Sequence, residues 1–495
     1  MSINIGVTDS LIVVAYMLAV VLFGIWVGRK GKSSTDYFLG GRSLPWGAVL
    51  LSIVATETST VTFLSIPGIA AAAGGDMTFL QITIGYIVGR LAVIFVLLPL
   101  YFKGEPLTAY EVLESRFGKM SRRTVAGLFL VTRNVSDSLR LFLTAMVLQI
   151  VLGLNLAISV VFIGAVTIVY TFIGGAKSVI WNDCIQFVVY MLGAAAAAVI
   201  IIDLTPGGLD EVLRFAASED KLRVFDFDLS PFKSSMTFWA GLVGGAFLTA
   251  ATHGTDQLMV QRYLSSRSQT EASLALGLSG FIVLIQFAVF LLIGIGLANF
   301  FGLAGNETGL STLKNDQLLA HFVVNYMPVG VLGLTLAAVF AAAMSTLSSS
   351  LNSSAAAFVN DLYWPLRKSN PDERTQLRAG RTATVAFGLV QMGLAILFGW
   401  VGTDESTVRN VLKIGGFAIG PVLGLYFLAV LVPRVAQRAA LSGFVAGVAV
   451  LSWVAMKTGV YWAWYAAIGS LVTMGSAWIF QNIMGDAEQS VASDD

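Results

Sequence analysis

The stretch AAAMSTLSSSLNSS at residues 341–354 places polar groups inside an otherwise apolar segment. It contains seven hydroxyl side chains and one Asn, and apolar residues flank it at 331–340 and 355–359. A helix in a membrane carries so many polar groups only where something polar lies against it. Helical spacing brings Ser345, Ser348 and Ser349 to one face, so their oxygens point to one place.

These hydroxyl groups have two interpretations. Their oxygens suit a hard cation such as sodium, whereas small hydroxyl residues also let membrane helices pack closely and hydrogen-bond to one another. Seven hydroxyls in this short stretch are more than close packing requires, so an ion site is the favoured interpretation.

The composition is that of a polytopic, all-α membrane protein. The 495 residues are 56% hydrophobic and 12% charged, too apolar for a protein with a polar surface. Apolar stretches long enough to cross the bilayer predict about thirteen spans in a single transmembrane domain over 1–495. The expected spans are 8–28, 44–73, 78–102, 121–151, 155–173, 178–203, 235–262, 272–301, 326–362, 376–401, 406–432, 435–456 and 459–482.

Several classes of site and partner are disfavoured. The single cysteine, Cys184, excludes an intramolecular disulfide, and two histidines leave little for a zinc site. A net charge of +1 argues against a nucleic-acid partner. The expected partners are the lipid bilayer, ions and a small-molecule solute, and no obligate protein partner is evident.

The basic residues predict the orientation in the membrane. Most of the 30 Lys and Arg fall in alternate loops, of which the first contains Arg29. Arg262 and Arg267 are assigned to another of these loops. The positive-inside rule makes these loops cytoplasmic. We therefore expect the protein in the plasma membrane, which is the inner membrane of a bacterium. The N-terminus is expected outside and the tail 483–495 in the cytoplasm.

Smaller features are also expected at the membrane surfaces. Apolar spacing predicts a short surface helix near 209–215 in the loop 204–234, and the loop 302–325 has room for another. Arg90 and Lys413 are expected toward the interfaces, where their side chains can reach water.

Two spans carry polar, Gly- or Pro-containing interruptions at membrane depth, which are tolerated only where they line a cavity. The second span contains ATETST at 55–60, followed by Pro67 and Gly68, and the seventh contains TAATHGTDQ at 249–257. Because they are five spans apart, we expect two inverted repeats, 44–203 and 235–432, with peripheral helices at 8–28 and 435–482. Unwinding would free the carbonyls of Ala55 and Thr58 for a cation that the side chains of Ser345 and Thr346 approach.

Four stretches carry a resemblance to a known family. They are SSTDYFLGGRSLPWGAVLLSIVATETST, IGGAKSVIWNDCIQ, GTDQLMVQRYL and AAAMSTLSSSLNS. The chain resembles the sodium/solute symporter family, which includes sodium/glucose cotransporters and bacterial sialic acid and proline transporters. The resemblance implies a leucine-transporter-like fold with Na⁺ as the coupling ion, and import of a small polar organic solute, a sugar or a carboxylate, by alternating access.

The resemblance also implies ion ligands. A first sodium would be held by carbonyls of Ala55, Thr58 and Ala342 and hydroxyls of Ser345 and Thr346. Some relatives hold a second sodium, and the matching positions are Asp183, Ser348 and Ser349.

Asp183 is informative without any family. An acidic group near a helix end in the membrane is costly, so a partner or an ion is expected. The alternative is a headgroup-level Asp that caps a helix beginning near Lys177.

The solute is expected beside the interrupted segments, between the two repeats. Candidate contacts are Glu57, Ser59, Thr62, Gln81, Thr83, Ser136, Arg140, Thr249 and Thr252. Glu57 can accept hydrogens from sugar hydroxyls or meet a cationic group; the alternative is an internal ion pair with Arg133 or Arg140.

The fourth span offers both ion pairs and an anion site. Asp137 is four residues from Arg133 and three from Arg140, the spacing of intrahelical pairs. The position of the carboxylate-binding Arg of sialic acid transporters is occupied here by Ser136, which disfavours sialic acid. Arg140, one turn further, keeps a monocarboxylate open as a solute.

The eleventh span is interrupted by Gly415, Gly416, Gly420 and Pro421. This interruption allows either a gating bend or close packing.

Other functions remain as alternatives. A proton-coupled transporter is the closest rival. A membrane sensor is disfavoured because the short acidic tail contains no signalling module. Acid–base pairs from Glu57, Asp137, Asp183, Asp256 and His253 would permit an enzyme, but neither a G-x-S-x-G nor an H-E-x-x-H motif occurs, so no enzyme is expected.

Overall fold

The computed structural model describes residues 6–29, 31, 33–104, 106–230, 232, 236–303, 317–367, 371–401, 419–432 and 435–484. The regular structure in these ranges is helical, and every one of the thirteen predicted ranges contains a helix. Lys413, Gly415, Gly416 and the tail 485–495 lie outside the described residues.

The first half of the chain contains long helices separated by short helical turns. In chain order these are α1 (Val7–Gly28), α2 (Ser34–Leu39), η1 (Gly40–Arg42), α3 (Trp46–Glu57), α4 (Thr60–Ala71), η2 (Thr78–Leu80), α5 (Gln81–Ala92), η3 (Val93–Leu97), α6 (Leu98–Tyr101), α7 (Glu111–Phe117), α8 (Lys119–Leu152), α9 (Leu156–Leu204) and α10 (Gly208–Ser218).

The second half repeats this alternation. It contains η4 (Ala240–Gly244), α11 (Gly245–Gly254), α12 (Gln257–Leu264), α13 (Gln269–Leu303), α15 (Leu318–Tyr326), α16 (Val331–Ala357), η6 (Phe358–Tyr363), α17 (Trp364–Arg367), α18 (Glu373–Val401), α20 (Ile419–Leu431), α21 (Gln437–Lys457), η7 (Trp462–Trp464) and α22 (Tyr465–Met484).

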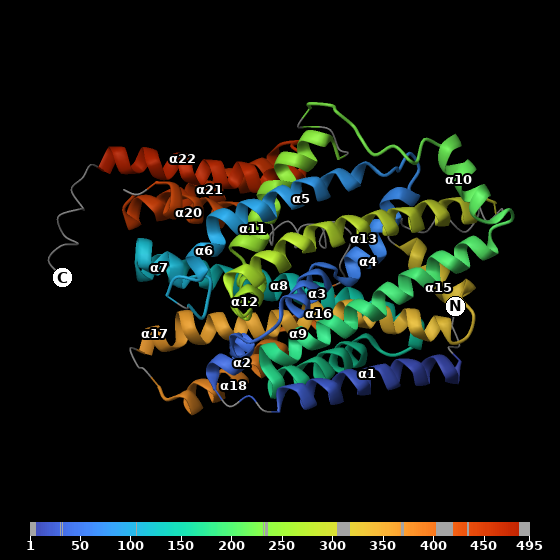
Figure 1. The fold of residues 1–495 in the computed structure, drawn as a ribbon, viewed down its shortest axis with the longest axis horizontal. Helices are drawn as coiled ribbons and strands as arrows, with labels where there is room; N and C mark the ends of the chain where they lie inside the picture. Colours follow the sequence, from blue (N-terminus) through green and yellow to red (C-terminus); the bar gives the residue numbers. More distant parts are fainter. Residues whose placement is uncertain are drawn as a thin grey trace.

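Eight described helices are long and apolar enough to cross a membrane, and the bent pair formed by α3 and α4 gives a ninth. They run along one common direction, with α10 and α15 at one end of the molecule and α7 and α17 at the other (Figure 1). We refer to these as the α10 end and the α17 end. The short helix α10 confirms the helix expected in the loop 204–234, and α15 lies partly in the loop 302–325.

The hydroxyl-rich helix α16 lies at the centre of the bundle. In its most apolar window 83% of residues are buried, compared with 28% in α1 and in α18. The hydroxyl groups of residues 345–354 are all buried. They therefore face protein rather than lipid, as a polar stretch in a membrane helix must.

The two predicted interruptions are real breaks. Helix α3 ends at Glu57, and the chain turns by 60° before α4 continues. Helix α11 ends at Gly254, and α12 begins at Gln257 after a cap by Asp256, whose Oδ1 accepts the amide of Leu258 at 2.9 Å.

Helix α9 contains two of the predicted spans in one assigned element. Its 49 residues bend at Gly175, whose φ of 54° is left-handed and therefore suits glycine. The bend separates the two predicted spans, 155–173 and 178–203. Asp183 lies in the second half, eight positions beyond this bend.

Candidate ion and solute site

The break between α3 and α4 leaves carbonyl groups open. Thr58 leaves the helical conformation with φ −86° and ψ 88°. The last carbonyls of a helix have no partner within it, so those of Ala55 and Thr56 are available to other groups. The side chain of Ser59 then starts α4 by accepting the Thr62 amide at 3.4 Å.

Two hydroxyls of α16 meet these carbonyls. The Ser345 hydroxyl donates to the Ala55 carbonyl at 2.8 Å, and the Thr346 hydroxyl lies 3.4 Å from the Thr56 carbonyl. Both hydroxyls also lie within 3.4 Å of the Ala342 carbonyl. The structure thus brings Ala55, Ala342, Ser345 and Thr346 together as predicted.

Thr58 and Thr56 also lie at this site. The hydroxyl of Thr58 accepts a hydrogen bond from Gln286 of α13 at 2.8 Å. Thr56, whose carbonyl faces Thr346, was not predicted as a ligand. Five neutral oxygens gathered at a broken helix form the kind of donor set that transporters use for sodium.

Asp183 lies at a junction of four helices and is fully buried. Its Oδ2 accepts hydrogen bonds from Ser52 at 2.5 Å, from Thr56 at 3.3 Å and from Arg262 at 3.2 Å. The alternative of a headgroup-level cap is wrong, because Asp183 lies inside α9 and its recorded partners belong to other helices.

Arg262 is the unexpected member of this junction. The charge distribution assigns it to a loop, but the structure places it in α12 with its side chain 3% exposed. Its guanidinium also donates to Thr56 at 2.5 Å, to Ser52 at 2.9 Å and to Ser349. A protein cation therefore lies between Asp183 and Ser349.

Ser348, the third residue assigned to a second sodium, points differently. Its hydroxyl donates to the Ser345 carbonyl at 3.2 Å. The two proposed ion positions are therefore adjacent along α16, one helical turn apart.

Glu57 forms an internal ion pair, but with Arg90 rather than Arg133 or Arg140. The Arg90 guanidinium donates to Glu57 at 2.5 Å, and His253 lies 3.5 Å from the same carboxylate oxygen. Arg90 is also wrongly expected at an interface: its side chain is 1% exposed, because α5 packs it against α11 and α13. The pair lies between the two broken spans.

The ion pairs expected in α8 are present. Asp137 lies 2.6 Å from Arg140 and 3.7 Å from Arg133. Arg133 also pairs with Asp256, the residue that caps α12. This second pair connects α8 to the break between α11 and α12.

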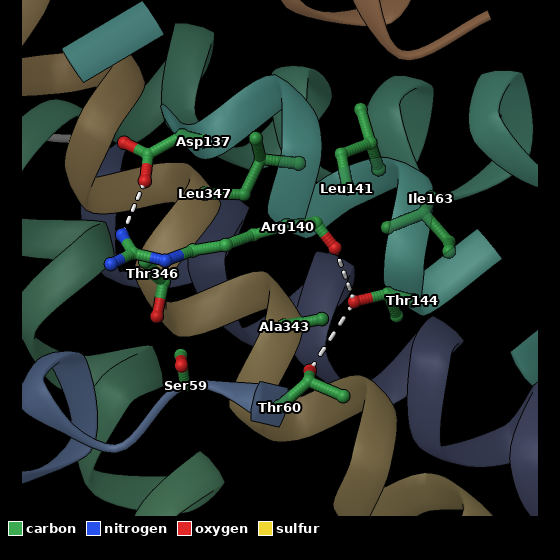
Figure 2. A pocket seen from close by; sticks show the side chains of 10 residues that line it. All are labelled: Ser59, Thr60, Asp137, Arg140, Leu141, Thr144, Ile163, Ala343, Thr346 and Leu347. Carbon is green, nitrogen blue, oxygen red and sulfur yellow. Dashed lines mark hydrogen bonds and ion pairs between the residues drawn. The ribbon is translucent and has the colours of Figure 1, made fainter. Parts of the chain in front are cut away.

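A small cavity, with room for about one water molecule, adjoins the oxygens at the helix break. Figure 2 shows the Arg140 side chain among the lining residues, with its guanidinium bonded to Asp137. The Arg140 side chain is 31% exposed, so it retains donors for a ligand. The cavity is lined by Ser59, Thr60, Asp137, Arg140, Leu141, Thr144, Ile163, Ala343, Thr346 and Leu347.

The other solute candidates are distributed around this region. Gln81 is fully buried and its amide binds the carbonyls of Thr78 and Met236, at 3.0 and 3.1 Å. The hydroxyl of Thr83 donates to the Leu80 carbonyl at 2.7 Å. Neither side chain lines the cavity of Figure 2.

The candidates from α8 and α11 are mostly buried. Ser136 is 9% exposed and Thr249 is 1% exposed. Thr252 contacts His253 through a 3.0 Å hydrogen bond. Of the nine predicted solute contacts, only Ser59 and Arg140 line the cavity.

Comparison of the sequence with known proteins shows the family to which the chain belongs. The model of the sodium:solute symporter family matches residues 37–447. The chain belongs to this family. The sodium/sialic acid symporter NanT of Aliivibrio fischeri is 32% identical over 480 residues, covering 95% of this chain and 92% of the relative. Sodium-coupled monocarboxylate transporter 1 of Mus musculus is 31% identical, covering 92% and 74%.

Solved structures confirm the fold. A substrate-bound, outward-open structure of a Na⁺-coupled sialic acid symporter superposes with a TM-score of 0.87 at 27% identity, covering 96% of this chain and 98% of that one. The structure of MhsT in complex with L-phenylalanine has a TM-score of 0.53 at 14% identity and is similar in fold alone. The chain is a multi-pass membrane protein, a symporter with the predicted broken-helix fold that uses Na⁺ as its coupling ion.

Proposed function

We propose that this sodium-coupled symporter imports a small monocarboxylate. The observation that supports the proposal is the position of Arg140 in the wall of a cavity that Thr346 also lines. The Thr346 hydroxyl is one of the five oxygens grouped around the helix break. An Arg guanidinium binds a carboxylate through charge-assisted hydrogen bonds. Relatives at 31% identity include monocarboxylate transporters.

In this proposal the first sodium is held by the carbonyls of Ala55, Thr56 and Ala342 and the hydroxyls of Ser345 and Thr346. Thr58 lies at the same break. Because the sodium and the carboxylate have opposite charges and share Thr346 as a neighbour, each stabilises the other's binding. That reciprocal coupling makes solute transport depend on the ion.

The Asp183 region is the proposed second sodium position. Arg262 neutralises Asp183 there. A sodium ion therefore reaches Asp183, Ser348 and Ser349 only when the guanidinium releases its hydrogen bonds to Asp183 and Ser349. Each sodium that enters down 100 mV contributes about 2.3 kcal/mol to the driving force. A second ion would roughly double this contribution.

The proposed orientation places the α17 end in the cytoplasm, because the loops rich in Lys and Arg lie at this end. The break between α3 and α4 then lies between an outer and a cytoplasmic half-helix. Opening on alternate sides of this break would expose the cavity first to one side of the membrane and then to the other.

An acidic sugar is the second candidate solute. The observation in its favour is the 32% identity to a sialic acid symporter over most of both chains. It would also present a carboxylate to Arg140. Ser136 occupies the position where sialic acid transporters carry their Arg, so Arg140 would have to serve instead.

Uptake by the purified full-length protein in proteoliposomes tests the proposal. With an inward sodium gradient, we expect uptake of labelled pyruvate that exceeds uptake of N-acetylneuraminic acid or glucose. Replacing sodium by potassium at constant pH should abolish this uptake. Equal uptake driven by a proton gradient alone would reject sodium coupling, and preference for N-acetylneuraminic acid would select the second candidate.

The variant Arg140→Gln tests the position of the carboxylate. A hydrogen bond between charged groups contributes about 1.5–3 kcal/mol, so the KM for pyruvate should rise by about tenfold or more. Arg214→Gln is the matched control, because Arg214 is 78% exposed in α10. An unchanged KM in Arg140→Gln would contradict the assignment.

A further inference from the structure

A row of buried polar side chains runs along the second half of α9. Ser178, Asn182 and Gln186 are spaced four residues apart, so they share one face of the helix. We call these three residues the α9 stripe. All are fully buried. The Ser178 hydroxyl and both amide atoms of Asn182 and of Gln186 have no hydrogen-bond partner among the described residues.

Helix α1 covers the stripe closely. A Cβ atom added to Gly24 would lie 2.7 Å from the Asn182 Nδ2 and 2.7 Å from the Ser178 hydroxyl. The phenol groups of Tyr16, also on α1, and of Tyr170 lie beside the Gln186 amide, whereas the described residues offer no hydrogen-bond partner to Ser178 or Asn182. The stripe therefore faces α1 and not the solute cavity.

The stripe reaches the proposed second sodium position. Asp183 follows Asn182 directly, and its Oδ1 has no partner in the described structure, whereas Oδ2 holds Ser52, Thr56 and Arg262. Tyr16 and Tyr170 lie within electrostatic range of the Asp183 carboxylate. Arg262 and its partners thus occupy one oxygen of Asp183, and the other remains available.

Such a group of unsatisfied polar atoms indicates that water or a cation binds here. Buried polar atoms without partners are unfavourable, and membrane helices place them where water or an ion satisfies them. Hydroxyl and amide oxygens are hard donors of the kind that replace the hydration shell of alkali cations. The stripe supplies three such side chains in sequence.

The stripe ends near a close contact between α1 and α9 at the α17 end. A Cβ atom on Gly28 would lie only 2.0 Å from the Gly174 Cα. Gly174 adjoins the bend at Gly175, and Ser178 lies one helical turn beyond it. A small separation of α1 from this bend would open the stripe to solvent.

We propose that Asn182 and Ser178, the part of the α9 stripe that leads from Asp183 toward the bend, form the path by which the cation released from Asp183 reaches the cytoplasm, between α1 and α9 and separate from the path of the solute. The proposal rests on the orientation and the sodium coupling proposed above. In it, Arg262 closes the side of Asp183 that faces α3 and α12. Sodium leaves past Asn182 and then Ser178 toward the bend at Gly175, whereas Gln186 lies on the other side of Asp183, toward the α10 end.

The first test separates sodium release from solute movement. Solute counterflow with equal sodium on both sides proceeds without net sodium release, whereas gradient-driven uptake requires it. For Asn182→Leu and Ser178→Ala we expect gradient-driven pyruvate uptake to fall by about tenfold with counterflow within about twofold of the wild type. Asn182→Ser, which retains a side-chain oxygen, should recover part of the uptake that Asn182→Leu loses.

Asn299→Leu is the matched control. Asn299 is 1% exposed in α13, and both of its amide atoms also have no partner in the described residues. Its replacement should leave both assays unchanged. If the α9 variants lose counterflow and uptake equally, or neither, the exit path is rejected.

The second test needs no solute and therefore distinguishes failure of the path from failure of the proposed function. In a Cys184→Ser background, which has no other cysteine, Asn182→Cys should react with a cationic methanethiosulfonate reagent applied at the α17 face, and sodium should slow the reaction. Asn299→Cys should react much more slowly. Equal reaction rates, or access only from the α10 face, would overturn the proposal.

Discussion

The hydroxyl of Ser345 donates a 2.8 Å hydrogen bond to the carbonyl of Ala55 across the break between α3 and α4. This contact joins two helices that lie 290 positions apart in the chain. It also marks the place where a sodium ion would take over the same two oxygens. The energetics of this region lead to several measurable consequences.

Ser345→Ala should weaken sodium binding. Loss of one ligand oxygen removes a favourable interaction of about 1.4 kcal/mol or more, so the sodium concentration for half-maximal uptake should rise by about tenfold or more. Sodium titration of uptake measures this effect. Ser353→Ala is the control, because the buried Ser353 hydroxyl bonds only the Ser350 carbonyl in the described structure; an equal shift in both variants would contradict the assignment.

Asp183 and Arg262 should behave as a coupled pair. Removing one partner of a buried ion pair leaves an uncompensated charge and costs about 3–5 kcal/mol. We therefore expect Arg262→Met and Asp183→Asn each to lower the thermal unfolding midpoint strongly. The double variant should be more stable than the sum of the single effects predicts, and simple additivity would show that the pair is uncoupled.

Glu57 and Arg90 should show the same coupling in stability but a different effect on transport. Glu57→Gln leaves Arg90 without its carboxylate partner, so the unfolding midpoint should fall. Arg90→Met with Glu57→Gln should recover part of that loss. Uptake measured alongside shows whether the pair only supports the structure: full uptake by the double variant would mean that neither group contacts the solute.

Lys221 should stabilise the α10 end of α4. Its ammonium donates to the carbonyls of Ala70, Ala72 and Gly75 at 3.0, 3.0 and 3.1 Å. Lys221→Met would leave these acceptors unsatisfied, at a cost of about 1–3 kcal/mol. Lys457→Met, at an exposed position, should change the unfolding midpoint little. A similar midpoint for both variants would contradict the role of Lys221.

Gly28 should tolerate no side chain. Alanine there would place its Cβ 2.0 Å from the Gly174 backbone, and overpacking of this kind costs about 1–3 kcal/mol. In Gly127→Ala the Cβ meets nothing within 4 Å, so that variant should be as stable as the wild type or more so. Thermal unfolding of the two variants in detergent provides the comparison.

The group of oxygens around Ala55 was predictable because its signal is local. Polar residues inside apolar runs mark the break, and the spacing of Ser345 and Thr346 places both hydroxyls on α16 near it. Each part could be recognised in its own segment. Helix α10 was predictable for a similar reason, since its apolar spacing is contained in the loop.

Arg90 and Arg262 were not predictable in this way. A single Arg at the end of an apolar run has the same sequence pattern whether it reaches water or turns inward. Only the packing of α5 against α11 and α13, and of α12 against α3 and α16, decides that both are buried. The partners of Glu57 and Asp183 are therefore properties of the tertiary structure, as is the unpartnered state of the α9 stripe.

Thr346 borders both the oxygens at the helix break and the cavity that contains Arg140. A mutation that reshaped this wall for a new cargo would also alter how firmly the driving ion is held. Solute preference and the efficiency of energy conversion would then evolve together. A variant that takes up a different solute would also need a different sodium gradient across the membrane.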